Sequence, residues 1–159
     1  MFMPVRAYIP PGTLREVVAY PRATEAYDAS AIAKALADVG LEHLASRLDE
    51  EDRWDRELTD DEKQCLAFAR VVLQRPGWVV VNDALDVLDP TSRERIRTLF
   101  SNELAEIGMI NIGHDQPETG FYLRKLHLVM DSSGQKFEPE REHPIAEPSK
   151  SSAESLPAE

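Results

Sequence analysis

Hydrophobic residues recur every three or four positions through the first half of the chain, which is the spacing of an amphipathic helix. The strongest such pattern begins at about Thr59 and runs to Gln74, where Arg75-Pro76 stops it. Weaker patterns of the same period lie upstream, between turn-forming prolines and glycines. Together they predict four helices, over residues 14–20, 31–40, 42–48 and about 59–74.

Beyond Pro76 the pattern changes to short apolar runs. Residues 78–81 read WVVV, which is typical of a strand buried on both faces of a parallel sheet. A helix is predicted over about 91–107, followed by strands at MINIG (109–113) and KLHLVMD (125–131). Because helices alternate with strands, we predict an α/β fold with short parallel strands.

The composition changes again at Ser132. Residues 132–159 are rich in Pro, Ser and Glu and poor in apolar residues, so we expect a disordered acidic tail. The chain has 159 residues, of which 42% are hydrophobic, and this suffices for one domain over 1–131. Within that domain we expect a helical subdomain over about 13–74 and a core of strands and helix over about 77–131.

The net charge of −11 argues against nucleic acid and anionic membranes as direct partners, because both would be repelled. The charge is concentrated in residues 49–63, where nine acids stand against three bases and leave a net −6. Blocks of like charge are usually solvated, so we expect an acidic loop there.

The remaining composition points to the cytoplasm. Cys65 is the single cysteine and lies in a helical pattern, so we expect a core residue and no intrachain disulfide. No apolar run approaches the roughly 20 residues that span a bilayer, and the start of the chain lacks a signal-peptide pattern. The four histidines show no metal-ligand spacing, so no metal site is predicted.

Residues 58–62, LTDDE, allow two interpretations. Thr59 and Glu62 fit a capping box, and Asp60 and Asp61 suit the positive end of a helix dipole. Alternatively, the free N–H groups of this helix start could hold an anionic ligand.

The order of these segments resembles a known family. A capped helix leads to an apolar strand that ends in Asn82-Asp83, a DVLDP turn follows at 86–90, and a second strand ends in Gly113-His114. This order resembles the C-terminal half of an ABC transporter ATPase domain, over about residues 1–131. Two stretches, FMPVRAYIPPGTLREVVAYP and RLDEEDRWDRELTDDEKQCLAFARVVLQRPGWVVVNDALDVLD, resemble subfamily-D-like bacterial permease–ATPase fusions of the peptide and cobalamin uptake type. The resemblance implies a partial P-loop NTPase fold with a helical signature subdomain.

The family's signature, Leu-Ser-Gly-Gly-Glu or Gln, would correspond to Leu58, Thr59, Asp60, Asp61 and Glu62. In the family this helix start holds the γ-phosphate of ATP bound to the opposite subunit. Here two aspartates replace both glycines, which adds bulk and negative charge beside a polyanion. Two unit charges 4 Å apart interact by about 4 kcal/mol at an effective dielectric near 20. We therefore expect a degenerate signature that mainly caps its helix.

The family's catalytic positions also differ. Its Asp-Glu pair corresponds to Asn82 and Asp83, so Asn82 brings no charge to magnesium and Asp83 places a shorter carboxylate where a general base would act. Asp89 matches the aspartate loop and His114 matches the switch histidine, whereas Val5 stands where the family has its glutamine. By resemblance, Asp83 and His114 are remnant catalytic positions. The alternative for each is an ordinary residue at a strand end.

None of the seven glycines is followed by Lys, whereas a P-loop reads Gly-x-x-x-x-Gly-Lys-Ser/Thr. We therefore expect that the chain has no binding site for a nucleotide of its own. The resemblance alone implies at most weak binding of ATP with magnesium.

Three functions follow from the resemblance. The first is a degenerate, truncated ABC transporter ATP-binding domain that lacks Walker A and hydrolyses little or no ATP. The second is a non-catalytic module, and the third contributes its signature and switch regions to a nucleotide site in trans. Apolar strands without covering neighbours invite pairing with another chain. We therefore expect docking on an ABC permease or second ATPase subunit, or self-association, in the cytoplasm at the inner face of the membrane.

Overall fold

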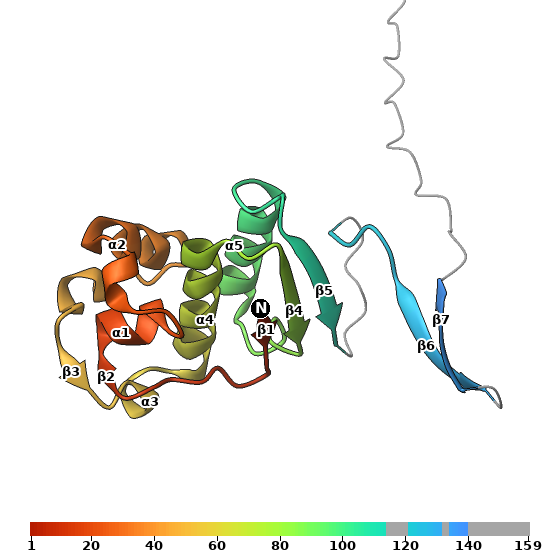
Figure 1. The fold of residues 1–159 in the computed structure, drawn as a ribbon, viewed down its shortest axis with the longest axis horizontal. Coiled ribbons are helices and arrows are strands. Elements are labelled where there is room, and N and C mark those ends of the chain that lie inside the picture. The colour runs from red at the N-terminus through yellow and green to blue at the C-terminus, as the bar shows by residue number, and fades with distance from the viewer. Residues whose placement is uncertain (114–120, 132–133, 140–159) are drawn as a thin grey trace, which may run out of the picture. The chain divides into compact units, whose positions relative to one another are not determined.

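The structure, a computed structural model, describes residues 1–113, 121–131 and 134–139. These residues fall into two compact units, Met1–Pro117 and Glu118–Glu159. The first unit, unit 1, contains the helices and a parallel sheet (Figure 1). The second unit, unit 2, contains one hairpin.

The predicted helices upstream of the acidic segment form largely as expected. Helix α1, Leu14–Ala19, begins at a capping box in which Thr13 and Glu16 satisfy each other's backbone N–H groups. Helix α2, Ala29–Asp38, is followed by Gly40 at φ +87°, a left-handed conformation that suits glycine. The third predicted helix differs, because Glu42–Arg47 forms the 3₁₀ helix η2 instead of an α-helix.

The acidic segment is more ordered than a solvated loop. Strand β3, Glu51–Asp52, pairs antiparallel with β2, Gly12–Thr13, and helix α3, Trp54–Glu57, follows. Trp54 is buried, and the Arg47 guanidinium lies 4.8 Å from the centre of its ring. The acidic side chains stay at the surface, while this one indole anchors the segment to the core.

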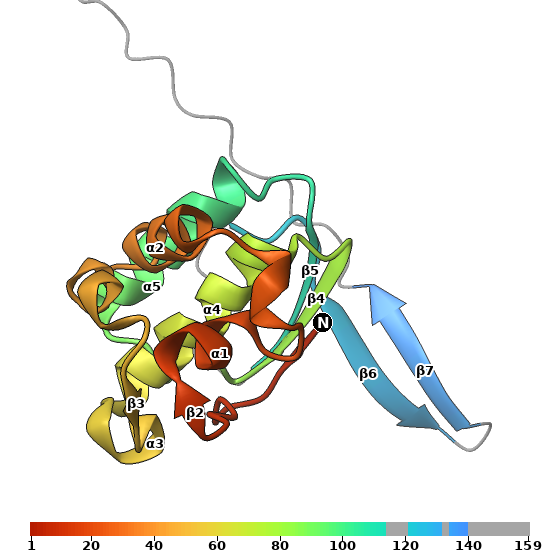
Figure 2. The ribbon, with the colours of Figure 1, turned by 60° about the vertical axis from the view of Figure 1, so that its left-hand side comes forward.

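Helix α4, Asp60–Gln74, is the centre of unit 1. Its residues from Gln64 to Val72 are all buried, so the helix is covered on every side rather than on the one face that its apolar spacing predicts. Helices α1 and α2 contact α4, and so does α5, Pro90–Ser101 (Figure 2). The ends of α4 are as predicted, at Thr59 and before Pro76.

Full burial of α4 forces its polar side chains to find partners within the protein. Arg70 donates from Nε and Nη2 to the carbonyl oxygen of Val17, at 3.1 and 2.9 Å, and from Nη1 to that of Tyr8, at 2.9 Å. Burial lowers the pKa of Arg70 to about 10. The guanidinium therefore ties the segment before α1, and α1 itself, to the central helix.

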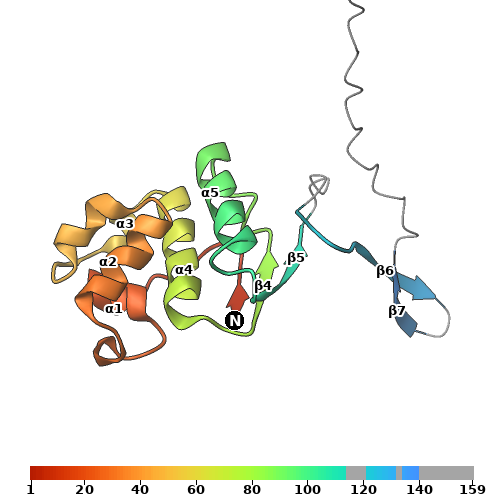
Figure 3. The same cartoon turned by 90° about the horizontal axis from the view of Figure 1, so that it is seen from above.

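Three short strands form the predicted parallel sheet, in the order β1-β4-β5. They are β1, Phe2–Met3, β4, Trp78–Asn82, and β5, Gly108–Ile112. Val79 and Val81 of β4 are fully buried on the side of the sheet that faces α4 and α5 (Figure 3). The predicted strands 78–81 and 109–113 are confirmed within a residue.

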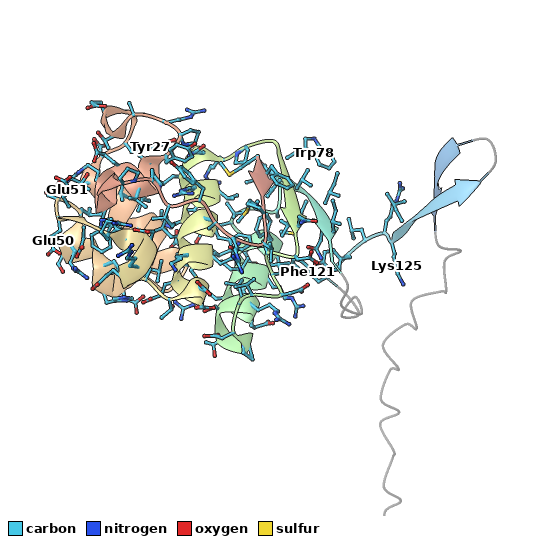
Figure 4. All side chains as sticks on the ribbon, turned by 90° about the horizontal axis from the view of Figure 1, so that it is seen from below. Tyr27, Glu50, Glu51, Trp78, Phe121 and Lys125 are labelled. Atoms are coloured by element: carbon cyan, nitrogen blue, oxygen red, sulfur yellow. The ribbon has the colours of Figure 1, made fainter. Side chains whose placement is uncertain are left out.

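The burial predicted for the run WVVV is wrong on the other face of the sheet. Phe2, Val80 and Ile110 pair across the three strands, and their side chains share this second face. Phe2 is 62% exposed and Ile110 is 48% exposed, and on the same face Trp78 and Ile112 are 63% and 52% exposed. Figure 4 shows Trp78 at the sheet end of unit 1, opposite Glu50 and Glu51. We call these five residues the open sheet face.

Three further segments differ from what the sequence predicts. The predicted third strand forms as β6, Leu126–Asp131, but it pairs antiparallel with β7, Gly134–Pro139, in unit 2. It therefore does not extend the parallel sheet that the pattern predicts, and β7 occupies part of the tail expected to begin at Ser132. Residues 140–159 lie outside the described residues. The helix predicted over 91–107 is shorter, because α5 ends at Ser101.

Replacing Arg70 by Met should lower the free energy of unfolding by about 2–3 kcal/mol. The methionine keeps much of the volume, but buried carbonyl oxygens lose their donors. Chemical denaturation measures the difference. Arg22→Met, which removes the same charge from an exposed position, is the matched control and should change the stability by less than about 0.5 kcal/mol. Equal effects of the two variants would contradict this role for Arg70.

Candidate functional site

The start of α4 carries the predicted capping box. The Thr59 hydroxyl oxygen accepts from the Glu62 N–H at 3.2 Å. In return, Glu62 Oε2 accepts from the Thr59 N–H at 2.8 Å and from its hydroxyl at 2.9 Å. The capping interpretation of LTDDE is therefore confirmed for this pair. Leu58, the first residue of the signature-like segment, is buried beneath the helix start.

Glu62 has a second neighbour in His43, whose Nε2 lies 3.3 Å from Glu62 Oε1. Burial favours the neutral form of Glu62, but the hydrogen bonds from Thr59 and the charge of His43 outweigh burial and lower the pKa of Glu62. The carboxylate is therefore held in its charged form at neutral pH, at the positive end of the α4 dipole.

The two aspartates of LTDDE behave differently. The Asp60 side chain is 87% exposed and lies 3.1 Å from the Lys63 ammonium. Asp61 is half-buried and turns toward α5, where its Oδ1 accepts from the Asp89 N–H at 2.8 Å and its Oδ2 accepts from the Ser92 hydroxyl at 3.0 Å. Sequence reasoning treats the two residues alike, because nothing in the sequence places Ser92 next to the start of α4.

Asp89 is itself the N-cap of α5. Its Oδ1 accepts from the Ser92 N–H at 2.8 Å, and Pro90 begins the helix. The structure therefore brings together two predicted site residues, Asp61 and Asp89, through a hydrogen bond between protein groups. Both helix starts use protein carboxylates to satisfy their backbone N–H groups.

A second polar cluster lies at the carboxyl ends of β4 and β5. Asp83 has φ +51°, and its N–H donates to the Ile112 carbonyl at 2.7 Å. A Cβ placed on Gly113 would lie 3.4 Å from Asp86 Oδ2 and 3.5 Å from Asn111 Nδ2. The same position is 3.7 Å from Asp83 Oδ1. Three polar side chains therefore converge on the residue that follows β5.

The turn between β4 and α5 is braced from the helix. Arg93 donates from Nε to the Leu85 carbonyl at 3.0 Å, and from Nη2 to those of Asp86 and Leu88 at 3.3 and 3.2 Å. Sequence reasoning missed Arg93, although an Arg three residues into a helix after an aspartate loop is well placed to reach back to that loop. The predicted His114 lies outside the described residues.

The predicted site residues thus form two separate groups of contacts. Asn82 and Asp83 stand at the end of β4, and residues 58–62 stand at the start of α4, joined to Asp89 by Asp61. In the part of the chain that the structure describes, no three His, Cys, Asp or Glu side chains are grouped so that they could hold a metal ion. A hollow of about 700 Å³ lies elsewhere, lined by Asp38 at the end of α2 and by residues of α5.

No helix within the described ranges combines the length and the apolar character needed to cross a bilayer.

The fold of unit 1 is of the ABC ATPase type. A bacterial Atm1-family ABC exporter with ATP bound has a TM-score of 0.61 and 21% identity to this chain, and the match covers 72% of this chain and 20% of the exporter. At this identity the likeness concerns the fold alone.

The sequence comparisons find homologues among ABC transporter ATP-binding proteins. An uncharacterized ABC transporter ATP-binding protein of Haemophilus influenzae is 30% identical over 138 residues, which cover 85% of this chain and 22% of the relative. The inner membrane ABC transporter ATP-binding protein YddA of Escherichia coli is 32% identical over 103 residues, which cover 65% of this chain and 18% of YddA. No protein-family model matches. The chain is homologous to the ABC transporter ATP-binding proteins and corresponds to part of an ABC ATPase domain. It spans about a fifth of the length of these relatives.

Replacing Glu62 by Gln should make unfolding less sensitive to acid. The pKa of Glu62 is lowered in the folded state, so its contribution is fully present above its ordinary pKa of 4.5 and is lost as the pH falls through the lowered value. At pH 7 we expect the variant to be less stable by about 0.3–1 kcal/mol, since Gln keeps the capping hydrogen bonds and loses only the charge.

The difference between wild type and E62Q should shrink below about pH 4. Thermal unfolding between pH 7 and pH 3 measures it. Glu106→Gln, at an exposed position, changes the net charge equally and is the control. A constant difference across this range would show that the charge of Glu62 is not what matters.

Proposed function

We propose that the chain is an ABC ATPase-related domain with a degenerate signature and a degenerate Walker B end, Asn82-Asp83, and that it neither binds nucleotide by itself nor hydrolyses ATP. The observation that carries this proposal is the position of Asp61. Asp61 lies in the first turn of α4, the helix start where, by resemblance, a γ-phosphate would be held, and its carboxylate accepts hydrogen bonds from the start of α5. The negative charge of the Asp61 carboxylate would therefore oppose the binding of a phosphate group at this helix start.

Electrostatics supports the same conclusion. Asp60 and Asp61 stand at neighbouring positions of the first turn of α4, with Glu62 charged beside them. Positive Lys63 offsets Asp60 only through an exposed pair. A triphosphate at this turn would face two or three carboxylates where the family has bare glycine amides.

The end of β4 also argues against hydrolysis. Asn82 is neutral, and Asp83 has its backbone in the left-handed region, fixed by the bond from its N–H to Ile112. Its carboxylate is one methylene shorter than the glutamate of the family, so a general base would stand back from an attacking water. Because Asn82 is a neutral amide, Asn82 and Asp83 together offer magnesium only one charged oxygen ligand group.

The proposal includes the absence of a Walker A contribution from these 159 residues, in which no glycine precedes a lysine. A cytoplasmic location goes with it, because an ABC ATPase domain works on the nucleotide side of its transporter.

Titration with magnesium-ATP tests the proposal. A ligand at 100 times its dissociation constant would add about 2.7 kcal/mol to the free energy of unfolding, and so raise the melting temperature by several degrees. We expect no rise at sub-millimolar ATP. A rise of several degrees would overturn the claim that this chain does not bind nucleotide by itself.

Replacing both Asp60 and Asp61 by Gly should restore the family's signature pattern without restoring turnover. Asn82 and Asp83 would still lack the groups for magnesium and water activation. We expect α4 to weaken by about 1 kcal/mol or more, because Gly is a poor helix residue and Asp61 loses its contacts with α5. Phosphate release from ATP measures turnover, and measurable hydrolysis in this variant would contradict the proposal.

A second candidate function, a non-catalytic interaction module, is favoured by the open sheet face defined above. Four of its five large apolar side chains are about half exposed or more. Contiguous apolar surface of this kind usually marks a protein contact. The partner would be an ABC permease, a second ATPase subunit or another copy of this chain.

Light scattering over a range of protein concentrations tests this surface. We expect the purified chain to associate as concentration rises, and the variant Ile110→Ser to associate less, because it removes a central apolar side chain of the face. Leu123→Ser, at a side chain that is 99% exposed in unit 2, is the control. A wild-type chain that remains monomeric at all concentrations would remove self-association from the candidates.

A further inference from the structure

Asp61 joins two helix starts that are far apart in sequence. Its two carboxylate oxygens accept from different groups of the α5 entrance, the Asp89 N–H at 2.8 Å and the Ser92 hydroxyl at 3.0 Å. Both bonds involve an ionisable acceptor, and hydrogen bonds to a charged acceptor are stronger than neutral ones. Asp89 and Ser92 are further linked by the N-cap bond of α5. The three residues form a closed set of hydrogen bonds, which we call the 61–89–92 latch.

The latch covers the single cysteine. Cys65 lies one turn along α4, is 2% exposed, and has its Sγ 3.8 Å from Asp61 Oδ2. Burial raises the pKa of the Cys65 thiol to about 12, so the thiol stays protonated at neutral pH and serves as a weak donor to Asp61. Asp61 and Ser92 therefore both lie against the thiol.

Other contacts between the two helices are of a different kind. Phe68 and Phe100 meet edge to face, with ring centres 6.3 Å apart. Near the ends of the helices Arg75 donates to the Glu103 carbonyl at 3.2 Å. These contacts hold the middle and the far ends of the pair, whereas the latch holds the two starts.

We propose that Asp61 is a positioning residue whose carboxylate latches the first turn of α4 to the first turn of α5. The latch fixes the turn at Asp89 against the signature-like segment and keeps Cys65 closed to solvent. The proposal goes beyond the proposed function and does not depend on it, because a latch of this kind holds whether or not the domain meets a nucleotide.

The rate at which iodoacetamide modifies Cys65 tests the latch. Because Cys65 is the single cysteine, one mass increment reports on one position. We expect Asp61→Ala to raise the modification rate about tenfold or more at neutral pH and without denaturant, because the α4–α5 entrance opens locally without global unfolding. Asp61→Asn removes the same negative charge from beside the thiol but keeps one acceptor oxygen, so a smaller increase than in Asp61→Ala separates opening of the entrance from a lowered thiol pKa.

Asp60→Ala is the matched control, since it removes the same side chain from the neighbouring, exposed position. Its rate should stay within about twofold of wild type. Ser92→Ala removes one bond of the latch from the other side and should also raise the rate, which keeps the test valid if Asp61→Ala fails to fold.

A denaturant series separates the latch from a general loss of stability. Local opening predicts modification rates that hardly depend on denaturant at low concentration, whereas global unfolding predicts a steep dependence. Equal rates for Asp61→Ala and Asp60→Ala, or a steep dependence for both the Asp61 and Ser92 variants, would overturn the proposal. Neither result bears on the magnesium-ATP titration, so the two proposals fail separately.

Discussion

The burial of helix α4 between the α1 and α2 layer and α5 largely separates the polar side chains of its buried part from water. Each must reach a group of the surrounding protein, and the partners it reaches decide where the neighbouring segments lie. Arg70 binds the carbonyl oxygens of Val17 and Tyr8, which fixes the path of the chain into α1. At the opposite end Asp61 binds the entrance of α5. One covered helix therefore sets the relation between the helical layer and the sheet.

The start of α4 shows how carboxylates of the protein can serve a helix terminus. Its open N–H groups and positive dipole favour an anion of either origin. In this chain Thr59 and Glu62 cap the helix, and Asp61 supplies a carboxylate to the next helix start. The proposed loss of nucleotide binding and the proposed latch would then have the same physical source, namely carboxylates inside the protein at a place suited to anions.

Local signals in the sequence predicted most of the helices and strands. The capping box of α4 depends only on two residues three positions apart, and the end of the helix depends only on Pro76. Both could therefore be predicted from the local sequence. The degree of burial was harder to predict. The run WVVV predicts a strand covered on both faces, but whether a second layer covers Trp78 depends on other segments, and here that face is open. Strand β6 formed where expected. A local pattern does not determine whether such a strand pairs with β7 or joins the parallel sheet, and here it pairs with β7.

Sequence reasoning could propose residues for the candidate site but could not give their contacts. Resemblance singled out Asp60 and Asp61 together, and only the packing of α5 against α4 distinguishes the exposed one from the bonded one. Arg93 was missed for the same reason. It donates to backbone carbonyl groups, which every residue has, so the sequence does not reveal its partners.

The left-handed backbone at Asp83 has a consequence for which residues fit this position. Asp and Asn enter that region more easily than residues with longer side chains. A single substitution to glutamate, which would lengthen the carboxylate, would have to be accommodated in a conformation that disfavours it. The short acid and the left-handed turn are therefore matched to one another at position 83.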